Sequence, residues 1–469
     1  MADFFSWLDG ILWGAPVLIL LGAVGILYAI RTRFFQFRKF GYILKSTMGE
    51  MFHKGGGATG TEGTLTPMQA VSSALAGCVG TGNIAGVATA MVVGGPGAVF
   101  WMWMIALLGM MTKCVEVTLA QYYRIKGGDG VYYGGPMYYI ERGMGKKWKP
   151  LAIFFSITIV IGGLGTAAFV QPYTLSTAIN NVTGVPTWIP TVVSAAICGV
   201  VIIGGVKGIG RFCEKITPTM CIIYIIGALG VIFCNIGNVP AAFAAIFKYA
   251  FTPLSAVGGL AGSTLALALR QGAARGTFSN EAGCGSSPIT HATAITEHPF
   301  KEGMYGSFEV FMDTLVICSM TALAILCAGP EVWQSGTKAE ALTMLAFTGT
   351  YGKVGNILVL IPLILFAFST MVGWEINYES AFFYIFGKET NAAKLIIRII
   401  WLVPGFLALG KTPELVWTIV DIVSGFWCIP NAIALLSLSG VFMKIYRDYN
   451  EKYILKSRPK TDVLEVVEK

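Results

Sequence analysis

The first candidate for chemistry is the stretch GCVGTGNIAG, Gly77 to Gly86, which holds four glycines in ten residues. From Gly80 onwards it matches G-x-G-x-x-G/A, the fingerprint of a loop that binds the phosphates of a dinucleotide. Such a loop follows a strand, opens a helix and is followed about 20 residues later by an acidic residue. Here the stretch lies in a long apolar segment, and no acidic residue stands between it and Glu116. The context therefore argues against nucleotide binding.

The same glycines could instead interrupt a helix. Each Gly costs about 1 kcal/mol relative to Ala in a helix interior, so this segment is a poor continuous helix. Close packing between helices, which Gly and Thr also permit, is the alternative explanation. A similar order of Gly, Thr, Asn and Ala-Gly recurs, with one insertion, in GTFSNEAG, Gly276 to Gly283. Two such segments favour the break.

Composition places both segments in a membrane. The 469 residues are 55% hydrophobic and 12% charged, with a mean hydropathy of +0.68. Several apolar stretches exceed the ~18 to 20 residues that a spanning helix needs, whereas strands of an outer-membrane barrel would be about 10 residues long and alternating. We therefore predict an all-α polytopic membrane protein with about eleven transmembrane helices. The expected spans are residues 11–31, 67–93, 96–122, 150–180, 186–206, 215–236, 255–290, 302–328, 353–387, 391–409 and 413–443.

The two interrupted segments fall in the second and seventh of these spans. Broken helices in corresponding positions indicate an inverted five-plus-five repeat, with the substrate held near the midplane where the breaks meet. We expect one repeat over residues 67–238 and the other over 252–409. Residues 1–66 would add an N-terminal helix and a cytoplasmic amphipathic linker, and residues 413–469 a last helix and a cytoplasmic tail.

Basic residues predict the orientation. If the first end lies outside, most Lys and Arg fall in cytoplasmic loops, as the positive-inside rule requires. The opposite loops hold only Lys248, Lys338, Lys353 and Lys411. The net charge of +8 then reflects topology and contact with anionic lipid, and requires no nucleic acid. We expect a plasma-membrane protein with its N-terminus outside and its C-terminus in the cytoplasm.

Two terminal features and the cysteines need no special function. The N-terminus MADFFSWLDG lacks the features of a secretory signal, so the first apolar segment should be retained as a span. An interfacial helix and a flexible linker are expected in FFQFRKFGYILKSTMGEMF and KGGGATGTEG. The ten cysteines show no metal-ligand or redox spacing and are expected to be small buried side chains.

The string GGPGAVFWMWMIALLG, Gly94 to Gly109, resembles the signature of the alanine/glycine:cation symporter family, also called sodium:alanine symporters. The resemblance extends over essentially the whole chain in length, span count and placement of the broken helices. It implies a leucine-transporter-like fold and Na⁺-coupled uptake of alanine or glycine. Na⁺ would be the co-transported cation.

Such a function needs groups for a carboxylate, an amine and a cation. Exposed N–H groups where a helix restarts bind anions, and Thr81 and Gly82 are the expected donors. The carbonyls of Ala76 and Val79, left free by the preceding half-helix, can ligate Na⁺, and the carbonyl of Cys78 can accept from the amine.

The ninth span supplies further oxygens in LFAFSTMVGWEINYE. Resemblance to the superfamily places a sodium site between Ser369, Thr370, the Phe366 carbonyl and the carbonyls of the second span. The alternative is that the hydroxyls bond back to carbonyls of their own helix. Trp374 lies one turn beyond Thr370, and against the pocket it would leave room for little more than a methyl group.

Other polar residues in the predicted spans have more than one possible role. Gln171 either bonds the substrate or caps the kink at Pro172. A second group of pocket residues is expected in the seventh span: Gln271, Gly272, Gly276, Thr277, Phe278 and Asn280. Charged side chains in the membrane must face partners or water; we expect internal pairing for Arg270, Arg275 and Glu281, and leave Asp313, Glu375, Glu379 and Asp421 as unranked proton or gating sites.

An enzyme and a channel are the rival classes. His291 and His298 stand seven apart in a predicted cytoplasmic loop, Asp129 lies in a loop, and no H-E-x-x-H or P-loop lysine occurs, so we expect no enzyme. A channel would not need two broken helices and a bulky pocket residue. The alternative within carriers is an H⁺-coupled carrier of another small amino acid or related solute. Stoichiometry, D or L preference and oligomeric state stay open, a monomer being the simplest expectation.

Overall fold

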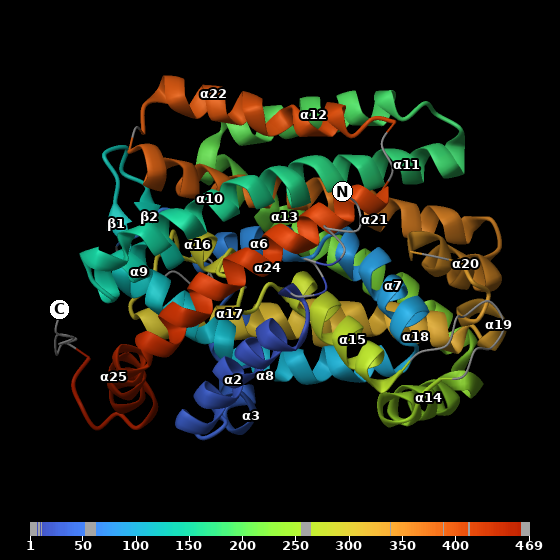
Figure 1. Ribbon diagram of the computed structural model, residues 1–469, viewed down its shortest axis with the longest axis horizontal. Helices are drawn as coiled ribbons and strands as arrows, with labels where there is room; N and C mark the ends of the chain where they lie inside the picture. Colours follow the sequence, from blue (N-terminus) through green and yellow to red (C-terminus); the bar gives the residue numbers. More distant parts are fainter. Residues whose placement is uncertain are drawn as a thin grey trace.

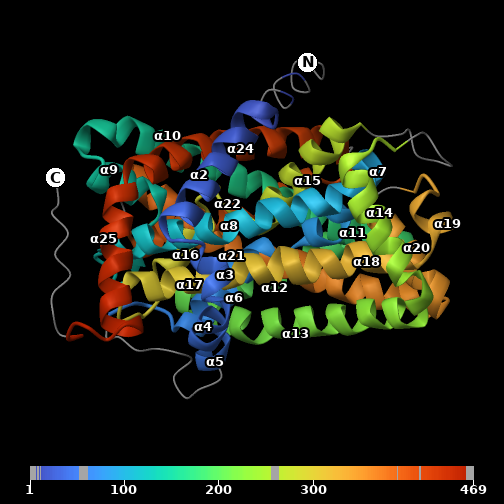
Figure 2. The same cartoon turned by 90° about the horizontal axis from the view of Figure 1, so that it is seen from below.

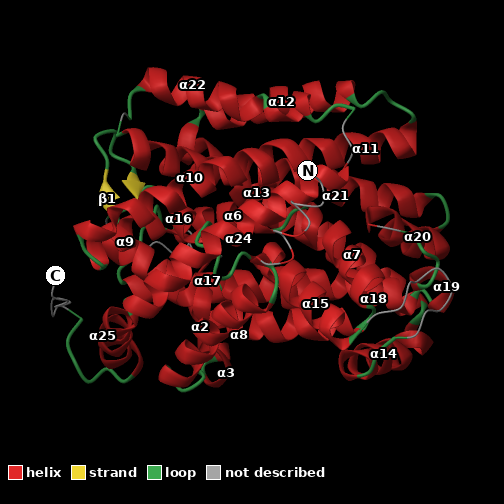
Figure 3. Cartoon of the chain, viewed as in Figure 1, coloured by secondary structure: helices red, strands yellow, loops and turns green. Residues whose placement is uncertain are grey.

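The computed structural model describes residues 7, 10, 12–51, 62–254, 264–337, 339–387, 389–410 and 413–460. This part of the chain is almost entirely helical, as predicted, and its strands form one short antiparallel pair, β1 (Ile125–Lys126) and β2 (Tyr132–Tyr133) (Figure 3). Several long helices run along the long axis of the molecule (Figure 1), namely α8 (Gly97–Tyr123), α10 (Lys149–Gly165), α13 (Gly205–Cys234) and α21 (Val354–Phe386).

A helix or a series of helices occupies the described part of each predicted span. Among the described residues, five helices are long and apolar enough to cross a membrane, and up to seven if each bent pair is one span. The total of eleven and the inverted repeat therefore stay predictions. The other long elements are α2 (Ala15–Arg31), α11 (Gln171–Thr183), α12 (Trp188–Ile203), α17 (Pro299–Val310), α18 (Ser319–Cys327), α22 (Asn391–Leu402), α23 (Pro404–Leu407) and α24 (Pro413–Ser437).

The second predicted span is broken, as expected from its glycines. It consists of α6 (Pro67–Cys78), a single 3₁₀ turn η1 (Thr81–Asn83) and α7 (Ala85–Gly94), and the two halves meet at an angle of 59°. Helix α6 begins with Pro67 in the first turn and a capping box, in which Thr66 and Gln69 bond each other's backbone N–H groups.

The seventh span is broken later than its glycines suggested. Helix α15 (Leu265–Asn280) contains Gly276 and continues to Asn280, and the chain restarts as α16 (Ser287–His291). Between them Glu281 has a left-handed φ of 54°, and Gly283 and Gly285 have φ of 92° and 77°. Glycine adopts such angles at little cost, whereas Glu does so rarely. Residues 255–263, at the predicted start of the span, lie outside the described residues.

Three π-helical turns are present among the described residues, and two of them lie in predicted spans. One is η3 (Thr166–Val170), between α10 and α11; the other is η5 (Phe311–Cys318), between α17 and α18. Pro172 follows η3, lacks an N–H and would clash with a carbonyl four residues earlier, which accounts for a widened turn there. π-Helical turns are uncommon and frequently mark functional sites.

Short elements gather at the two ends of the long helices (Figures 1 and 2). One end holds the β1–β2 pair, α9 (Pro136–Gly143) and α25 (Ser439–Tyr449). The other end holds α14 (Val239–Phe251), α19 (Pro330–Trp333) and α20 (Ala339–Tyr351). The basic loop over residues 124–149 and the C-terminal helix thus share one end, as the predicted topology requires.

The predicted interfacial helix is divided into three short pieces, α3 (Phe35–Arg38), α4 (Phe40–Ser46) and α5 (Met48–Met51). Phe35 and Ile43 are buried, so this segment packs onto the protein as well as lying near the predicted interface. Most of the expected linker, residues 54–61, lies outside the described residues. The remaining short helices are η2 (Lys146–Trp148), η4 (Ile236–Asn238) and η6 (Asn450–Ile454).

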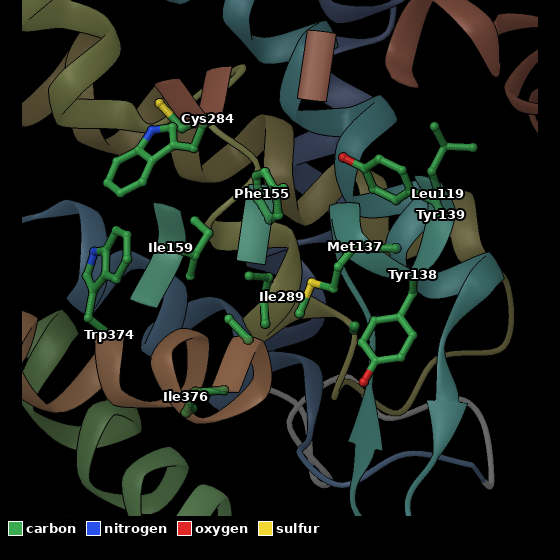
Figure 4. Packing of buried hydrophobic residues seen from close by; sticks show 14 of the residues in the cluster. Leu119, Met137, Tyr138, Tyr139, Phe155, Ile159, Cys284, Ile289, Trp374 and Ile376 are labelled. Atoms are coloured by element: carbon green, nitrogen blue, oxygen red, sulfur yellow. The ribbon is translucent and has the colours of Figure 1, made fainter. Parts of the chain in front are cut away.

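The largest buried cluster joins α10, α21 and α24 to the segment after α15. Figure 4 shows part of it, with Trp374 and Cys284 on one side and Phe155 and Ile159 between them and the aromatic residues of α9. A cavity lies beside this cluster, and it is lined by residues from both broken spans.

Candidate functional site

The cavity is enclosed by the α6 break, the α10–α11 junction, the end of α15, α21 and α24. The cavity volume, counted as the space open to the centre of a water molecule, is ≈ 30 Å³. One water needs about 10–15 Å³ by this measure, so the cavity holds a few waters or one small solute. Its lining residues are Gly77, Cys78, Gly80, Gly82, Thr166, Gln171, Phe278, Ser279, Glu281, Cys284, Thr370, Trp374, Ser424 and Trp427.

The α6 break frees a carbonyl on one wall. In a continuous helix the N–H of Gly80 would bond the carbonyl of Ala76, four residues earlier. Here the Gly80 N–H donates to Asn83 Oδ1 at 2.9 Å, and the Ala76 carbonyl accepts from Thr370 Oγ1 at 3.0 Å. A Cβ on Gly80 would lie 2.7 Å from that hydroxyl, so this contact requires glycine.

Oxygens gather around the Thr370 hydroxyl. Thr370 Oγ1 also lies 2.9 Å from the Phe366 carbonyl, to which Ser369 Oγ donates at 3.0 Å. The bond back within α21 and the contact to the broken helix therefore occur together. A hydroxyl has one hydrogen and satisfies one carbonyl at a time, and such an oxygen group suits a hard cation.

Two members of the predicted sodium set lie less centrally. Ser369 Oγ packs against Met220 Sδ at 3.2 Å. Val79 ends α6 with φ −76° and ψ 87°, and its carbonyl is not among the hydrogen-bond acceptors of Ser369 or Thr370.

Two tryptophans form the opposite wall. The rings of Trp374 and Trp427 lie 5.6 Å apart between centroids, tilted by 32°. A Cβ on Gly162 of α10 would lie 2.0 Å from the Trp427 ring, so Gly162 makes room for it. Trp427 was not predicted to line the site, because α24 lies outside both expected repeats and carries no break.

Glu281 brings a carboxylate to this wall. Its side chain accepts from Trp374 Nε1 at 2.9 Å and from the Ser286 hydroxyl. No Lys, Arg or His among the described residues lies within 4.0 Å of it. The expected internal pairing is present, but with neutral donors, and the carboxylate also faces the cavity.

Gln171 caps the kink before Pro172, one of the two roles left open for it, and its bond to the substrate stays a prediction. It lines the cavity, and its Oε1 lies 3.4 Å from the N–H of Thr81. Its Nε2 donates to the Thr166 carbonyl at 3.3 Å, which satisfies an acceptor in the π-helical turn before Pro172.

Five predicted residues of α15 do not line the cavity. A Cβ on Gly272 would lie 2.3 Å from the Ala98 carbonyl, and one on Gly276 would lie 2.8 Å from Ile105. These glycines let α15 approach α8 closely, so helix packing explains them, and their predicted place in the substrate site stays a prediction. Gln271, Thr277 and Asn280 are likewise absent from the lining, whereas Phe278 is present. Thr81 also stands beside the cavity rather than in its lining, next to Gly80 and Gly82.

A buried polar cluster supports the cavity from behind. Glu309 accepts from Cys78 Sγ at 2.8 Å and lies 3.5 Å from Lys113 Nζ. The Ser287 hydroxyl lies 2.9 and 2.7 Å from its two carboxylate oxygens. His291 joins Glu309 to Glu302 at 3.0 and 2.7 Å. The predicted cytoplasmic loop is thus wrong for His291, which is fully buried at the end of α16.

Charged residues at the end with β1 and β2 pair with one another. Arg398 bonds both Glu375 and Glu379, and Lys394 bonds Asp129 at 2.5 Å. Burial raises the pKa of Asp129, but the hydrogen bond from Lys394 outweighs this effect and brings the pKa below its ordinary value. These contacts identify Glu375 and Glu379 as paired groups. The side chain of Asp421 lies outside the described residues.

Sequence reasoning missed Thr166, Ser279, Cys284, Ser424 and Trp427 in the lining. Ser279 and Cys284 lay within the segment GTFSNEAGCGSS that marked the second break. The order of residues showed where the break falls, but not which side chains turn inward.

Known proteins resemble this chain over nearly its whole length. The model of the sodium:alanine symporter family matches residues 1–463. The sodium/alanine symporter AgcS of Methanococcus maripaludis is 38% identical, over 96% of this chain and 98% of its own. The probable sodium/glutamine symporter GlnT of Bacillus subtilis is 36% identical, over 95% of this chain and 90% of its own.

Among solved structures, the crystal structure of MhsT in complex with L-phenylalanine matches with a TM-score of 0.59 and 16% identity, over 81% of this chain and 90% of that one. At that identity the match shows the fold, which is leucine-transporter-like. Together with the broken apolar helices, the family match makes this a multi-pass membrane protein. The chain belongs to the sodium:alanine symporter family.

Proposed function

We propose that this protein carries alanine, or glycine, into the cell together with Na⁺ by alternating access. The observation that carries the proposal is the Thr370 hydroxyl, held between the Ala76 carbonyl of a broken helix and the Phe366 carbonyl beside a small cavity. It offers a cation several oxygens that are not all satisfied within one helix. Family membership supplies the class of substrate.

The substrate would lie between the two breaks. Its carboxylate meets the backbone around Gly82, where η1 restarts the helix and directs N–H groups and the positive end of the dipole outward. Its ammonium group meets Glu281, the one carboxylate among the described lining residues. This assignment replaces the Cys78 carbonyl as the main amine partner, because no basic side chain of the described residues lies within ion-pair distance of Glu281.

The indole rings select for size. With Trp374 and Trp427 packed side by side and Trp374 fixed by its bond to Glu281, the space beside the ammonium group suits a hydrogen or a methyl group. Larger side chains would have to displace a buried ring. The sodium ion would be ligated by Thr370, Ala76 and Phe366, with Ser369 and Val79 completing the shell.

The protein is placed with its N-terminus outside and its C-terminus in the cytoplasm. The basic loop over residues 124–149 and α25 share one end of the molecule (Figure 2). That end would face the cytoplasm by the positive-inside rule. The ion pairs of Arg398 and Lys394 would then lie on the cytoplasmic side, where they can close the route to the cavity.

The test is uptake of labelled alanine into sealed proteoliposomes. Uptake should saturate and should require an inward Na⁺ gradient, with glycine competing and glutamine competing poorly. A pH gradient alone should not drive it. Uptake driven by pH without Na⁺ would favour an H⁺-coupled carrier, and preferred competition by glutamine would assign the larger substrate.

A further inference from the structure

Asp313 is a carboxylate that the proposed transport reaction has not used. It is fully buried in η5, within the apolar helix series Pro299–Cys327 that is long enough to cross a membrane. It lies outside the cavity lining, and the structure places it in a π-helical turn, a feature that recurs at functional sites.

Every hydrogen bond to Asp313 comes from a neutral group. Asn83 Nδ2 donates to Oδ1 at 2.7 Å. The hydroxyls of Ser279 and Thr314 lie 2.8 Å from Oδ2. No Lys, Arg or His among the described residues lies within the 4.0 Å of an ion pair with it.

The titratable groups around Asp313 do not supply a positive charge. Glu309 of α17 is a like charge, and Lys113 of α8 is paired with Glu309. The other titratable neighbours are the thiols of Cys318, Cys78 and Cys221, on η5, α6 and α13. An ionised carboxylate without a counter-charge is strongly disfavoured in such surroundings, so it takes up a proton or a cation.

We propose that Asp313 carries a proton in this structure and exchanges it with the substrate cavity during transport. This inference rests on the proposed function for its place in the transport cycle. The proton comes from water and returns to water, and the carboxyl group is neutral while the cavity is closed.

The geometry indicates which oxygen is protonated. An amide nitrogen only donates, so Oδ1 stays an acceptor for Asn83. Hydroxyl groups accept as well as donate, so Oδ2 can carry the proton and donate to Ser279 or Thr314. Na⁺ fits less well, because the Asn83 oxygen is already used by the Gly80 N–H at 2.9 Å.

Ser279 provides the route. Its hydroxyl touches Asp313 Oδ2 at 2.8 Å, and the residue also lines the cavity. Water in an open cavity therefore reaches Asp313 through one hydroxyl. When substrate and Na⁺ close the cavity and displace that water, the ionised form loses its solvation and the carboxylate takes up a proton.

Asp313 and its neighbour Thr314 also connect the two breaks. Asn83 of the first break donates to Asp313, and Asn280 at the second donates to Thr314 Oγ1 at 3.0 Å. Both Asn side chains use their oxygen to accept a backbone N–H at their own break. A change of charge on Asp313 would therefore alter hydrogen bonds at both breaks.

The experiment measures protons bound by the full-length protein in detergent, in a weakly buffered solution with a pH-indicator dye. Adding Na⁺ and alanine to wild-type protein should make the medium more alkaline by roughly one proton per chain, since one carboxyl group binds one proton. Asp313→Asn should abolish this change. Glu331→Gln, a carboxylate-to-amide change at an exposed position of α19, should leave it intact.

Infrared spectroscopy of the same samples detects the protonated carboxyl group without requiring transport. A band of a buried protonated carboxyl group should be present in wild type and absent in Asp313→Asn. If Asp313→Asn does not fold, Ser279→Ala should keep the band at a shifted frequency and slow the proton uptake.

The outcomes separate this inference from the proposed function. Alanine binding with no proton uptake and no Asp313 band overturns the inference alone. An equal proton signal in Asp313→Asn, or loss of a bound Na⁺ in that variant, also overturns it. Failure of wild type to bind alanine, with the Asp313 band present, overturns the substrate assignment and leaves the protonated carboxyl group supported.

Discussion

The first and second breaks both leave a backbone N–H without its helical partner, but different residues form them. At each, an Asn side chain accepts a backbone N–H that has lost its helical partner: Asn83 serves Gly80, and Asn280 serves Ala282, both at 2.9 Å. The first break needs one 3₁₀ turn between Cys78 and Ala85. The second needs the longer run from Asn280 to Ser287, with three residues at positive φ.

The difference lies in what each break presents to the cavity. The first presents glycine backbone and a freed carbonyl, with no charged side chain. The second presents Glu281, held in a left-handed conformation that a non-glycine residue adopts at a cost, which is often found at functional sites. We infer that backbone partial charges at the first break serve the cation and carboxylate, and that the full charge at the second serves the ammonium group.

The largest expected effect comes from removing that full charge. Glu281→Gln should weaken alanine binding about 100-fold, because losing one partner of a buried charge pair costs about 2–5 kcal/mol. Gln keeps an oxygen for the Trp374 N–H, so the ring should stay in place. The measurement is competition by alanine and by propionate, which lacks the amine. If the variant prefers alanine over propionate as strongly as wild type does, the ammonium group binds elsewhere.

The next effect tests the first break. Thr370→Ala should raise the Na⁺ concentration for half-maximal uptake roughly ten- to a hundredfold, the range seen when groups that orient a metal site are lost. Apparent alanine affinity should weaken too, because the two bindings are coupled reciprocally. Thr370→Ser keeps the hydroxyl and is the control. An unchanged Na⁺ dependence in Thr370→Ala would move the cation site away from this hydroxyl.

The sequence predicts some parts of the candidate site better than others. The α6 break was predictable because glycines with Thr and Asn in an apolar segment disfavour a helix, and Ser369 and Thr370 are adjacent hydroxyls in an apolar span. Gly272 and Gly276 show where the sequence is ambiguous, because a glycine in a helix permits either a break or close packing against a neighbouring helix. Their contacts with Ala98 and Ile105 decide for packing.

Other parts of the site depend on tertiary structure alone. The inward carboxylate of Glu281 follows from its left-handed φ and from Trp374 on a helix about 90 residues later, which no local pattern encodes. Trp427 reaches the cavity only because Gly162 of α10 leaves space for its ring. Asp313 was noticed as a carboxylate in an apolar span, but its partners at both breaks come from folding.

An effect of intermediate size is expected on the selection against larger substrates beside Glu281. Trp374→Ala should weaken alanine binding modestly and admit valine and leucine as competitors, with about 0.8 kcal/mol gained per methylene that fills the space. The measurement is a competition series of glycine, alanine, valine and leucine. Gly86→Ala is a matched control, since its Cβ would meet nothing within 4 Å. An unchanged rank order in Trp374→Ala would leave the limit to Trp427 or Phe278.

A smaller effect compares the two Asn residues directly. Asn83→Ala and Asn280→Ala should each lower thermal stability, because a buried N–H left unpaired costs about 1–3 kcal/mol. Asn83→Ala should also reduce Na⁺-driven uptake, since Asn83 holds Gly80 where even a Cβ would lie 2.7 Å from the Thr370 hydroxyl. Thermal unfolding and uptake of both variants check this. Equal losses of uptake would mean that the breaks do not divide their roles as inferred.

The smallest effect comes from the N-terminal caps of α6, which precedes the first break, and of α17, which follows the second broken span. Helix α6 begins at Thr66, which does not titrate, whereas α17 begins at His298, whose Nδ1 accepts the Phe300 N–H at 3.1 Å and whose Nε2 faces Asp448 at 3.2 Å. Burial lowers the pKa of His298 to about 4, below its ordinary value of about 6.5. The folded state thus binds this proton less readily than the unfolded state does. The contribution of His298 is complete above pH 6.5 and decreases as the pH falls towards 4.

His298→Asn should remove that part of the pH dependence, because Asn caps a helix without titrating. Thermal unfolding of wild type and variant between pH 7.5 and 4.5 measures the difference between them, so that other acidic groups cancel. The gap should change in favour of the variant as the pH falls. A constant gap would mean that His298 has the same pKa in the folded and unfolded states, so that this cap adds no acid sensitivity.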